Sequence, residues 1–180
     1  MQAKNLVFLD ETAINLAMTR TYGRSAKGNR VYDTRPYERG TNLTLIGAIS
    51  LSGFSGIMTI DSGTSKNVFQ VFIEQVLLPN LWPGACLVMD NLPAHKVQEI
   101  RNIIEAAGIK VLYLSPYSPE FNPIENCWSK IKEYLRGVAA RTRDDLEIAL
   151  MEAIEQVSLT DIRNWFTHCC YCTSPSSKVL

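Results

Sequence analysis

LVFLD at residues 6–10 and CLVMD at residues 86–90 are two short apolar runs that each end in an aspartate. Continuous apolar runs of this length are typical of central strands that are buried on both faces of a sheet. Ligand sites in open α/β sheets lie beyond the carboxyl ends of such strands. The two runs therefore predict an α/β fold with Asp10 and Asp90 at strand ends, where a ligand site would form.

The apolar patterns elsewhere predict the other elements. They indicate hairpin strands at 43–51 and 54–60, a helix at 65–79, a helix at 97–108, a strand at 110–114, and helices that begin near Asn122, Thr142 and Asp161. Strands therefore come first, and helices and strands then alternate, so right-handed crossovers would place the later strands parallel to the first. We expect one domain at 1–172 and a disordered tail at 173–180.

Composition limits the function classes. A chain of 180 residues with 46% hydrophobic residues is long enough for one domain with a core. The 18 basic and 18 acidic residues give a net charge of zero, which argues against a self-sufficient nucleic-acid binder. Basic residues nevertheless gather between the first two strands, and we take them as candidate DNA contacts: Arg20, Arg24, Lys27, Arg30, Arg35 and Arg39.

The sequence shows no targeting or membrane segment. The apolar run at 6–9 is far shorter than the core of a signal peptide, and no run reaches transmembrane length. The five cysteines are an odd number without disulfide-like spacing, which predicts free thiols in a reducing compartment. We therefore expect a cytoplasmic protein, associated with the nucleoid when it is bound to DNA.

A third acid, Glu125, lies in the first turn of the helix that begins near Asn122. If that helix packs beside the sheet, Glu125 could face the same crevice as Asp10 and Asp90. Clustered carboxylates repel one another, and hard oxygen ligands select Mg²⁺ or Mn²⁺. Taken singly, each acid has another interpretation: Asp10 as a surface residue, Asp90 as turn chemistry, and Glu125 as part of a helix cap with Asn122, which alone is the better interpretation of that residue.

Three motifs together resemble the catalytic half of bacterial insertion-sequence transposases related to mariner elements. They are FLDET at 8–12, MDN at 89–91 with His95, and SPEFNPIE at 118–125. The 34 residues between Asp90 and Glu125, 125 − 90 − 1, fit the aspartate-aspartate-34-glutamate spacing of that family. The resemblance implies a ribonuclease-H-like fold, in which a mixed five-stranded sheet, its first three strands antiparallel, is flanked by helices. Asp10 would lie on the first strand, Asp90 at the end of the fourth, and Glu125 on a helix after the fifth.

The resemblance also implies the chemistry. Asp10 would bridge two Mg²⁺ or Mn²⁺ ions, and Asp90 and Glu125 would hold one each, for phosphodiester hydrolysis at the transposon ends and 3′-hydroxyl strand transfer into target DNA. Asn91, His95 and Asn122 are candidates to support these ligands from behind. Lys132 and Arg136 follow Glu125 at helical spacing and are further candidate DNA contacts.

The family usually carries an N-terminal helix-turn-helix that recognises the transposon ends, and we expect this chain to lack it. Such a segment could come from a second reading frame joined by frameshifting, or the element could be a truncated copy. Synapsis of two ends would require at least a homodimer. The alternatives are a related ribonuclease-H-like nuclease or resolvase, and a non-catalytic remnant that binds DNA or a partner subunit.

Overall fold

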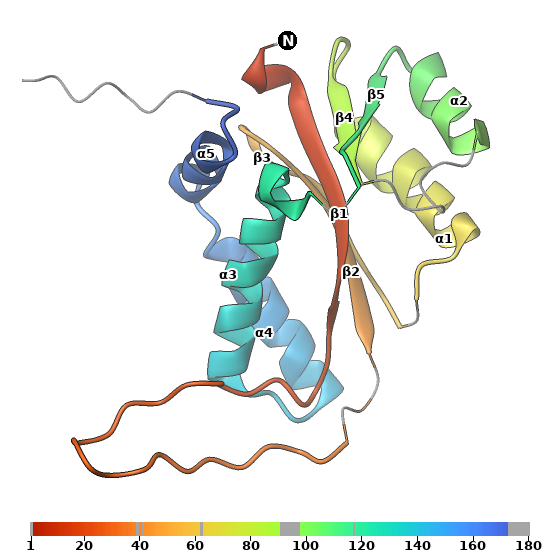
Figure 1. Ribbon diagram of the computed structural model, residues 1–180. Coiled ribbons are helices and arrows are strands. Elements are labelled where there is room, and N and C mark those ends of the chain that lie inside the picture. Colours follow the sequence, from red (N-terminus) through yellow and green to blue (C-terminus); the bar gives the residue numbers. More distant parts are fainter. Residues whose placement is uncertain are drawn as a thin grey trace, which may run out of the picture.

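The computed structural model describes residues 2–38, 40, 42–61, 63–90, 98–116 and 118–172. Its centre is a mixed sheet of five strands: β1 (Leu6–Ile14), β2 (Leu43–Ser50), β3 (Gly53–Ile60), β4 (Cys86–Met89) and β5 (Lys110–Tyr113), in the spatial order β3-β2-β1-β4-β5 (Figure 1). β1, β2 and β3 pair antiparallel, whereas β4 pairs parallel with β1 and β5 parallel with β4. The predicted ribonuclease-H-like sheet is confirmed.

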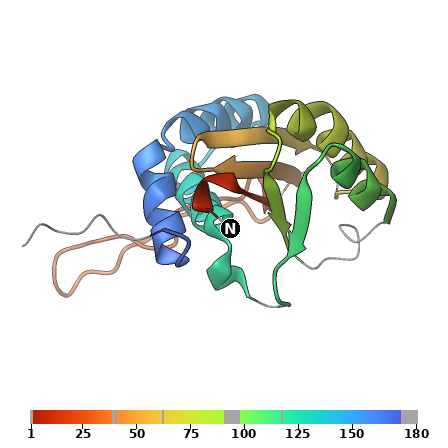
Figure 2. The same ribbon diagram turned by 90° about the horizontal axis from the view of Figure 1, so that it is seen from above.

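Helices cover both faces of this sheet. α1 (Lys66–Val71) and α2 (Gln98–Ala106) lie on one side, and α3 (Pro123–Val138), α4 (Arg143–Glu155) and α5 (Leu159–His168) lie on the other (Figures 1 and 2). Short 3₁₀ turns at Ala3–Asn5 and Pro119–Phe121 precede β1 and α3. No helix that the structure describes is long and apolar enough to cross a membrane.

The continuous apolar run of β1 follows from its burial on both faces. Leu6 and Phe8 belong to the cluster beneath α3, α4 and α5, whereas Val7 and Leu9 belong to the cluster beneath α1 and α2. Successive side chains of a strand alternate between the faces of a sheet. Asp10 therefore shares the α3 side with Leu6 and Phe8, and this alternation decides which helix it meets.

Three local predictions were only partly right. β1 continues through Asp10 to Ile14, because its antiparallel partner β2 extends further than its parallel partner β4, so Asp10 lies inside the strand. The predicted helix at 65–79 is capped by Ser65 and begins at Lys66, but it changes to π-helix at Phe72–Leu77 and to 3₁₀ at Leu78–Asn80. Asn122 is the N-cap residue of α3 and Pro123 its first residue, as predicted, but the Asn122 side chain makes no capping hydrogen bond.

Three further local predictions are confirmed. The hairpin turns at Leu51 and Ser52, between β2 and β3, and Gly53 adopts a φ of 122° that favours glycine. The Thr142 hydroxyl caps α4 by accepting from the amide of Asp145. All five cysteines are free thiols. The predicted tail at 173–180 lies outside the described residues.

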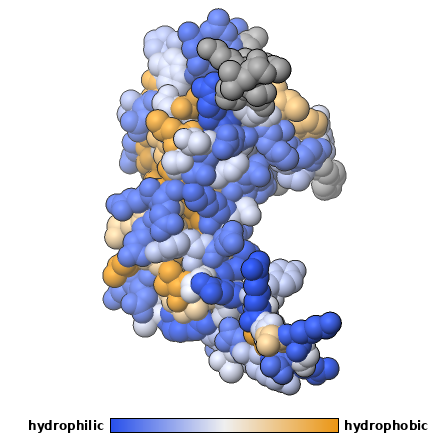
Figure 3. All heavy atoms as spheres, turned by 90° about the vertical axis from the view of Figure 1, so that its left-hand side faces the viewer, coloured by the Kyte–Doolittle hydropathy of each residue, from blue (hydrophilic) through white to orange (hydrophobic). Residues whose placement is uncertain are grey.

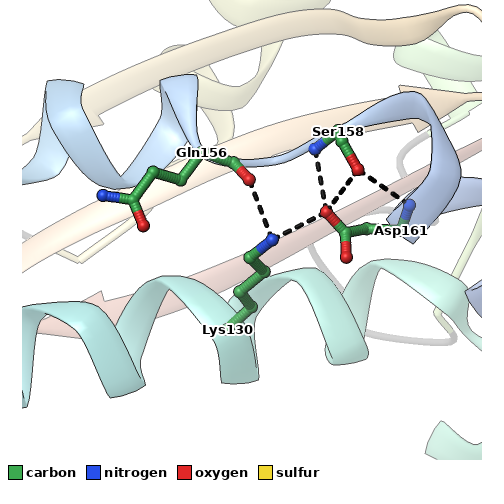
Figure 4. Close-up of polar contacts among 4 residues, drawn as sticks. All are labelled: Lys130, Gln156, Ser158 and Asp161. Carbon is green, nitrogen blue, oxygen red and sulfur yellow. Dashed lines mark hydrogen bonds and ion pairs between the residues drawn. The ribbon is translucent and has the colours of Figure 1, made fainter.

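A polar network joins α3 to the connection between α4 and α5 (Figure 4). The Lys130 ammonium donates to the carbonyl of Gln156 at 2.8 Å and to Oδ2 of Asp161 at 2.6 Å. The same carboxylate accepts from the amide and the hydroxyl of Ser158, which forms a capping box for α5. The hydrogen bonds from Lys130 and Ser158 lower the pKa of Asp161 to about 2. The Asp161 carboxylate thus links α5 to α3 through its contact with Lys130.

We expect Asp161→Asn to lower the free energy of unfolding by about 1 kcal/mol at pH 7, since solvent screens much of this half-exposed ion pair. The depressed pKa fixes the sign: the contribution is complete above the ordinary pKa of about 3.8 and disappears as the pH falls towards 2. Urea unfolding at several pH values measures it. Exposed Glu155 provides the control Glu155→Gln, and equal stability of the two variants at pH 7 would contradict the role of Asp161.

Candidate active site

Asp10 is a buried carboxylate in the middle of the sheet. Its side chain is 6% exposed, and its Oδ2 accepts a hydrogen bond of 3.1 Å from the ring nitrogen of Trp128 on α3. Burial is the main cause that raises the pKa of Asp10 to about 7, and the negative charges of Glu125 and Asp90 raise it further. Ionisation of a carboxyl group buried in this way is unfavourable unless a cation binds beside it.

Asp90 follows the last residue of β4. The parallel register aligns Leu9 of β1 with Met89 of β4, so Asp10 and Asp90 are the next residues along two adjacent strands. Val88 lies in the same core cluster as Phe8, and by strand alternation Asp90 shares their side of the sheet. The expected position of Asp90 at the end of the fourth strand is confirmed.

Glu125 comes to the same place from α3, which packs directly against β1. It lies in the first turn of the helix, three residues before Trp128, and therefore on nearly the same face. Burial raises the pKa of Glu125 and the charge of Asp90 adds to this, whereas the charge of Lys132 lowers it. The charges of Glu125 and Asp90 thus act on Asp10, and that of Asp90 acts on Glu125, which the helix-cap interpretation of Glu125 does not require.

The donor set fits a hard divalent cation. The charges of Asp90 and Glu125 both help to raise the pKa of Asp10, and a cation bound beside Asp10 would relieve this repulsion. Among the described residues, no three His, Cys, Asp or Glu side chains stand close enough to hold one ion together. Mg²⁺ is commonly bound through one or two carboxylates and keeps several waters. Two ions could therefore be held here, each by Asp10 and one further acid, with water as the remaining ligands.

The basic candidates divide into two groups. Arg35, Lys132 and Arg136 line a groove of about 290 Å³ between the β1–β2 loop and α3, and Arg20 and Arg136 line a neighbouring groove of about 800 Å³. Neither groove contains the three acids. Lys132, which lines the smaller groove, also interacts with two of the acids. Burial lowers the pKa of Lys132, and the charges of Glu125 and Asp10 raise it by less.

The outer part of the β1–β2 loop projects from the body of the protein, and its surface is largely hydrophilic (Figure 3). It carries Arg24, Lys27 and Arg30, which are exposed and line neither groove. The structure therefore brings only some of the predicted basic residues between β1 and β2 next to α3.

The supporting candidates have different outcomes. Asn91, His95 and Arg39 lie outside the described residues. Asn122 is 3% exposed, and its Oδ1 is one of the buried side-chain atoms without a hydrogen-bond partner among the residues described. Trp128, by contrast, was not among the predicted site residues. Its indole N–H could have signalled more, because a buried tryptophan N–H usually needs a polar partner.

The sequence model of the DDE superfamily endonuclease family matches residues 5–147, which include all three acids. The chain belongs to the DDE superfamily endonuclease family. The Tcb2 transposase of a transposable element in Caenorhabditis briggsae is 28% identical over 148 residues, a match that covers 76% of this chain and 54% of that protein. The chain thus spans about half the length of this relative.

Solved structures of Mos1 transposase share the fold of this DDE-family chain. A paired-end complex with the left transposon end has a TM-score of 0.76 at 18% identity, and the likeness covers 93% of this chain and 52% of that one. The mariner Mos1 paired-end complex with Mg has a TM-score of 0.70 at 17% identity, covering 93% and 54%. Because these likenesses cover 93% of the chain, they extend beyond residue 147, where the family match ends.

Proposed function

We propose that this DDE-family domain cleaves DNA with two Mg²⁺ or Mn²⁺ ions held by Asp10, Asp90 and Glu125, and that it joins transposon ends to target DNA. The observation that carries the proposal is the placement of three carboxylates by β1, the end of β4 and the first turn of α3, near enough for the charges of Asp90 and Glu125 to act on Asp10. Family membership supports the endonuclease activity, and the DNA and Mg of the Mos1 complexes support the partner and the cofactor.

Asp10 would be a ligand of both ions, because it is the most buried of the three acids and the charges of both others act on it. Asp90 and Glu125 would each complete the protein ligands of one ion. When bound, such a pair of ions activates an attacking oxygen and stabilises the leaving one in an in-line phosphoryl displacement. The chain's own part is to bring the three carboxyl groups near one another on β1, at the end of β4 and in the first turn of α3.

Lys132, Arg136 and Arg35 would bind the phosphates that lead into this site. Lys132 is the residue that interacts with both Glu125 and Asp10, and it lines the same groove as the two arginines. Contacts of this kind position a nucleic-acid backbone without reading its sequence. Sequence recognition of transposon ends would then come from a helix-turn-helix segment, supplied with this domain or by frameshifting, and synapsis from a homodimer.

The type of element and its cellular location are also proposals. The relatives are nematode transposases, so they do not support the predicted bacterial insertion sequence. Together with the Mos1 structures they support a relationship to the Tc1 and mariner elements. The expected location, in the cytoplasm and on the nucleoid, applies only if the host is a bacterium.

A supercoiled plasmid tests the proposal. We expect the purified protein to nick the plasmid with Mg²⁺ and not with EDTA, and Glu125→Gln to reduce the rate by about a hundredfold or more, as loss of a metal-site group does. Glu120→Gln, which changes an exposed acid five residues earlier, is the matched control. Junctions between nicked ends and new DNA would identify a transposase. Nicking without junctions would indicate a nuclease or resolvase, and equal rates for the two variants would rule out the proposed site.

A further inference from the structure

The contact between Trp128 and Asp10 joins two buried polar groups that are 118 positions apart in the sequence. The indole nitrogen of Trp128 donates to Oδ2 of Asp10 at 3.1 Å, and the residue is 2% exposed. Water therefore cannot replace Asp10 as the partner of this N–H, and a buried donor without a partner is unfavourable. The hydrogen bond ties the rotamer of Asp10 to the position of α3.

Gly47 on β2 makes room for the indole ring. Gly47 is the residue paired with Asp10 across β1 and β2. A Cβ at this position would lie 2.6 Å from Cη2 and 3.3 Å from Cζ2 of Trp128, the first of which is closer than real Cβ contacts allow. The glycine is thus required for space. The absent side chain opposite Asp10 is what lets a tryptophan from α3 lie beside the carboxylate.

The hydrogen bonds of Asp10 leave part of its carboxylate available. An ionised carboxylate offers about four lone-pair positions on its two oxygens. Trp128 uses one of them, and the backbone N–H of Glu11 uses another. With these two donors from the described part of the chain, about two positions are left for cations. A carboxylate held by two fixed donors also loses less freedom when it binds an ion than one that rotates.

We propose that Trp128 is a positioning residue for Asp10, and that Gly47 provides the space that permits it. The inference rests on the proposed function, since it assumes that Asp10 binds the cations. Trp128 would act through Asp10 and would not touch DNA or metal. Its loss would weaken cation binding because Asp10 could then adopt rotamers that turn its oxygens away from Asp90 and Glu125.

Manganese binding by the purified chain tests this directly. The electron paramagnetic resonance signal of free Mn²⁺ measures the affinity without DNA or catalysis. We expect Trp128→Phe to weaken Mn²⁺ binding about tenfold, the lower end of what loss of a supporting group costs at metal sites. Trp165→Phe, which changes a half-buried tryptophan on α5, should bind like the wild type. Thermal unfolding of each variant shows whether it is folded.

A second measurement separates positioning from packing. In protein labelled with ¹⁵N-tryptophan, Mg²⁺ should shift the indole resonance of Trp128 and leave those of Trp82 and Trp165 unchanged. If Trp128→Phe does not fold, benzothienylalanine at position 128 replaces the N–H by sulfur in a ring of similar shape, with Trp82 and Trp165 changed to Phe. Gly47→Ala should displace the ring and weaken Mn²⁺ binding in the same direction, with Gly63→Ala, which has open space at its Cβ, as control.

The outcomes distinguish the inference from the proposed function. If the wild type binds Mn²⁺, Asp90→Ala weakens that binding, and Trp128→Phe binds like Trp165→Phe, the positioning role is overturned while the metal site stands. If the wild type does not bind Mn²⁺, or Asp90→Ala changes nothing, the proposed site itself fails and the inference fails with it.

Discussion

Asp10→Asn is expected to abolish Mg²⁺-dependent nicking, by on the order of a thousandfold or more, and at the same time to stabilise the metal-free protein. The loss follows because an amide cannot supply the negative charge with which Asp10 would bridge the ions. The gain in stability follows from burial. An amide oxygen still accepts the hydrogen bond from Trp128, and it carries no charge that the interior of the protein disfavours.

The pH dependence gives the sign of the stability change. Burial raises the pKa of Asp10 from 3.8 to about 7, so the folded metal-free protein holds a proton that the unfolded chain releases. The resulting stability is complete below about pH 4 and is lost as the pH rises through 7. Above pH 7 we expect Asp10→Asn to be more stable than the wild type by on the order of 2 kcal/mol.

Urea unfolding in EDTA between pH 4 and pH 8 measures this difference. The two proteins should have similar stability near pH 4 and diverge as the pH rises. Asp144→Asn, which changes an acid in the first turn of α4, is the matched control and should not reproduce the divergence. A wild type whose stability relative to Asp10→Asn is independent of pH would contradict the account of Asp10 as a strained, buried acid.

Phe166→Ala is expected to cost about 3 to 5 kcal/mol of the free energy of unfolding, as large-to-small substitutions of buried aromatic residues do. Phe166 on α5 is fully buried, and its ring packs edge-on against Phe8 of β1 at a centroid distance of 5.2 Å. Tyr171 continues the cluster, since its ring lies 4.8 Å from that of Phe8 and its hydroxyl donates to the carbonyl of Phe121. α5 thus supports the strand that carries Asp10.

Chemical denaturation at pH 7 tests this role of α5. Arg163→Ala, an exposed position on the same helix, is the control and should lie within about 0.5 kcal/mol of the wild type. A cost below about 1 kcal/mol for Phe166→Ala would show that α5 is only loosely attached to the sheet. The result also decides whether the segment after residue 147, beyond the match to the family, is needed for a stable domain.

Much of the fold was predictable because its signals are local. The apolar runs before Asp10 and Asp90 indicate strands buried on both faces, and the cap residues Ser65 and Thr142 mark helix starts. The length of β1 was not predictable. It depends on β2 extending past Asp10 on one side while β4 stops at Met89 on the other, and strand partners are set by the tertiary structure.

The sequence could propose the three acids but not their surroundings. Motif order and spacing pointed to Asp10, Asp90 and Glu125 as candidate ligands, since these are the properties that the family resemblance preserves. The hydrogen bond from Trp128 and the space at Gly47 depend on α3 crossing β1 and β2, and no local pattern records that crossing. Asn122 is the N-cap residue of α3, as its place before Pro123 indicated, but its buried side chain makes no capping hydrogen bond, which the local sequence did not show.

A crystal structure of the protein grown with Mn²⁺ tests the central claim most directly. Anomalous scattering locates the metal without any assumption about its ligands. The account predicts two anomalous peaks, roughly 3.5 to 4 Å apart, with Asp10 between them and Asp90 and Glu125 on one peak each. Crystals that contain Mn²⁺ elsewhere on the protein while these three carboxylates hold none would contradict it.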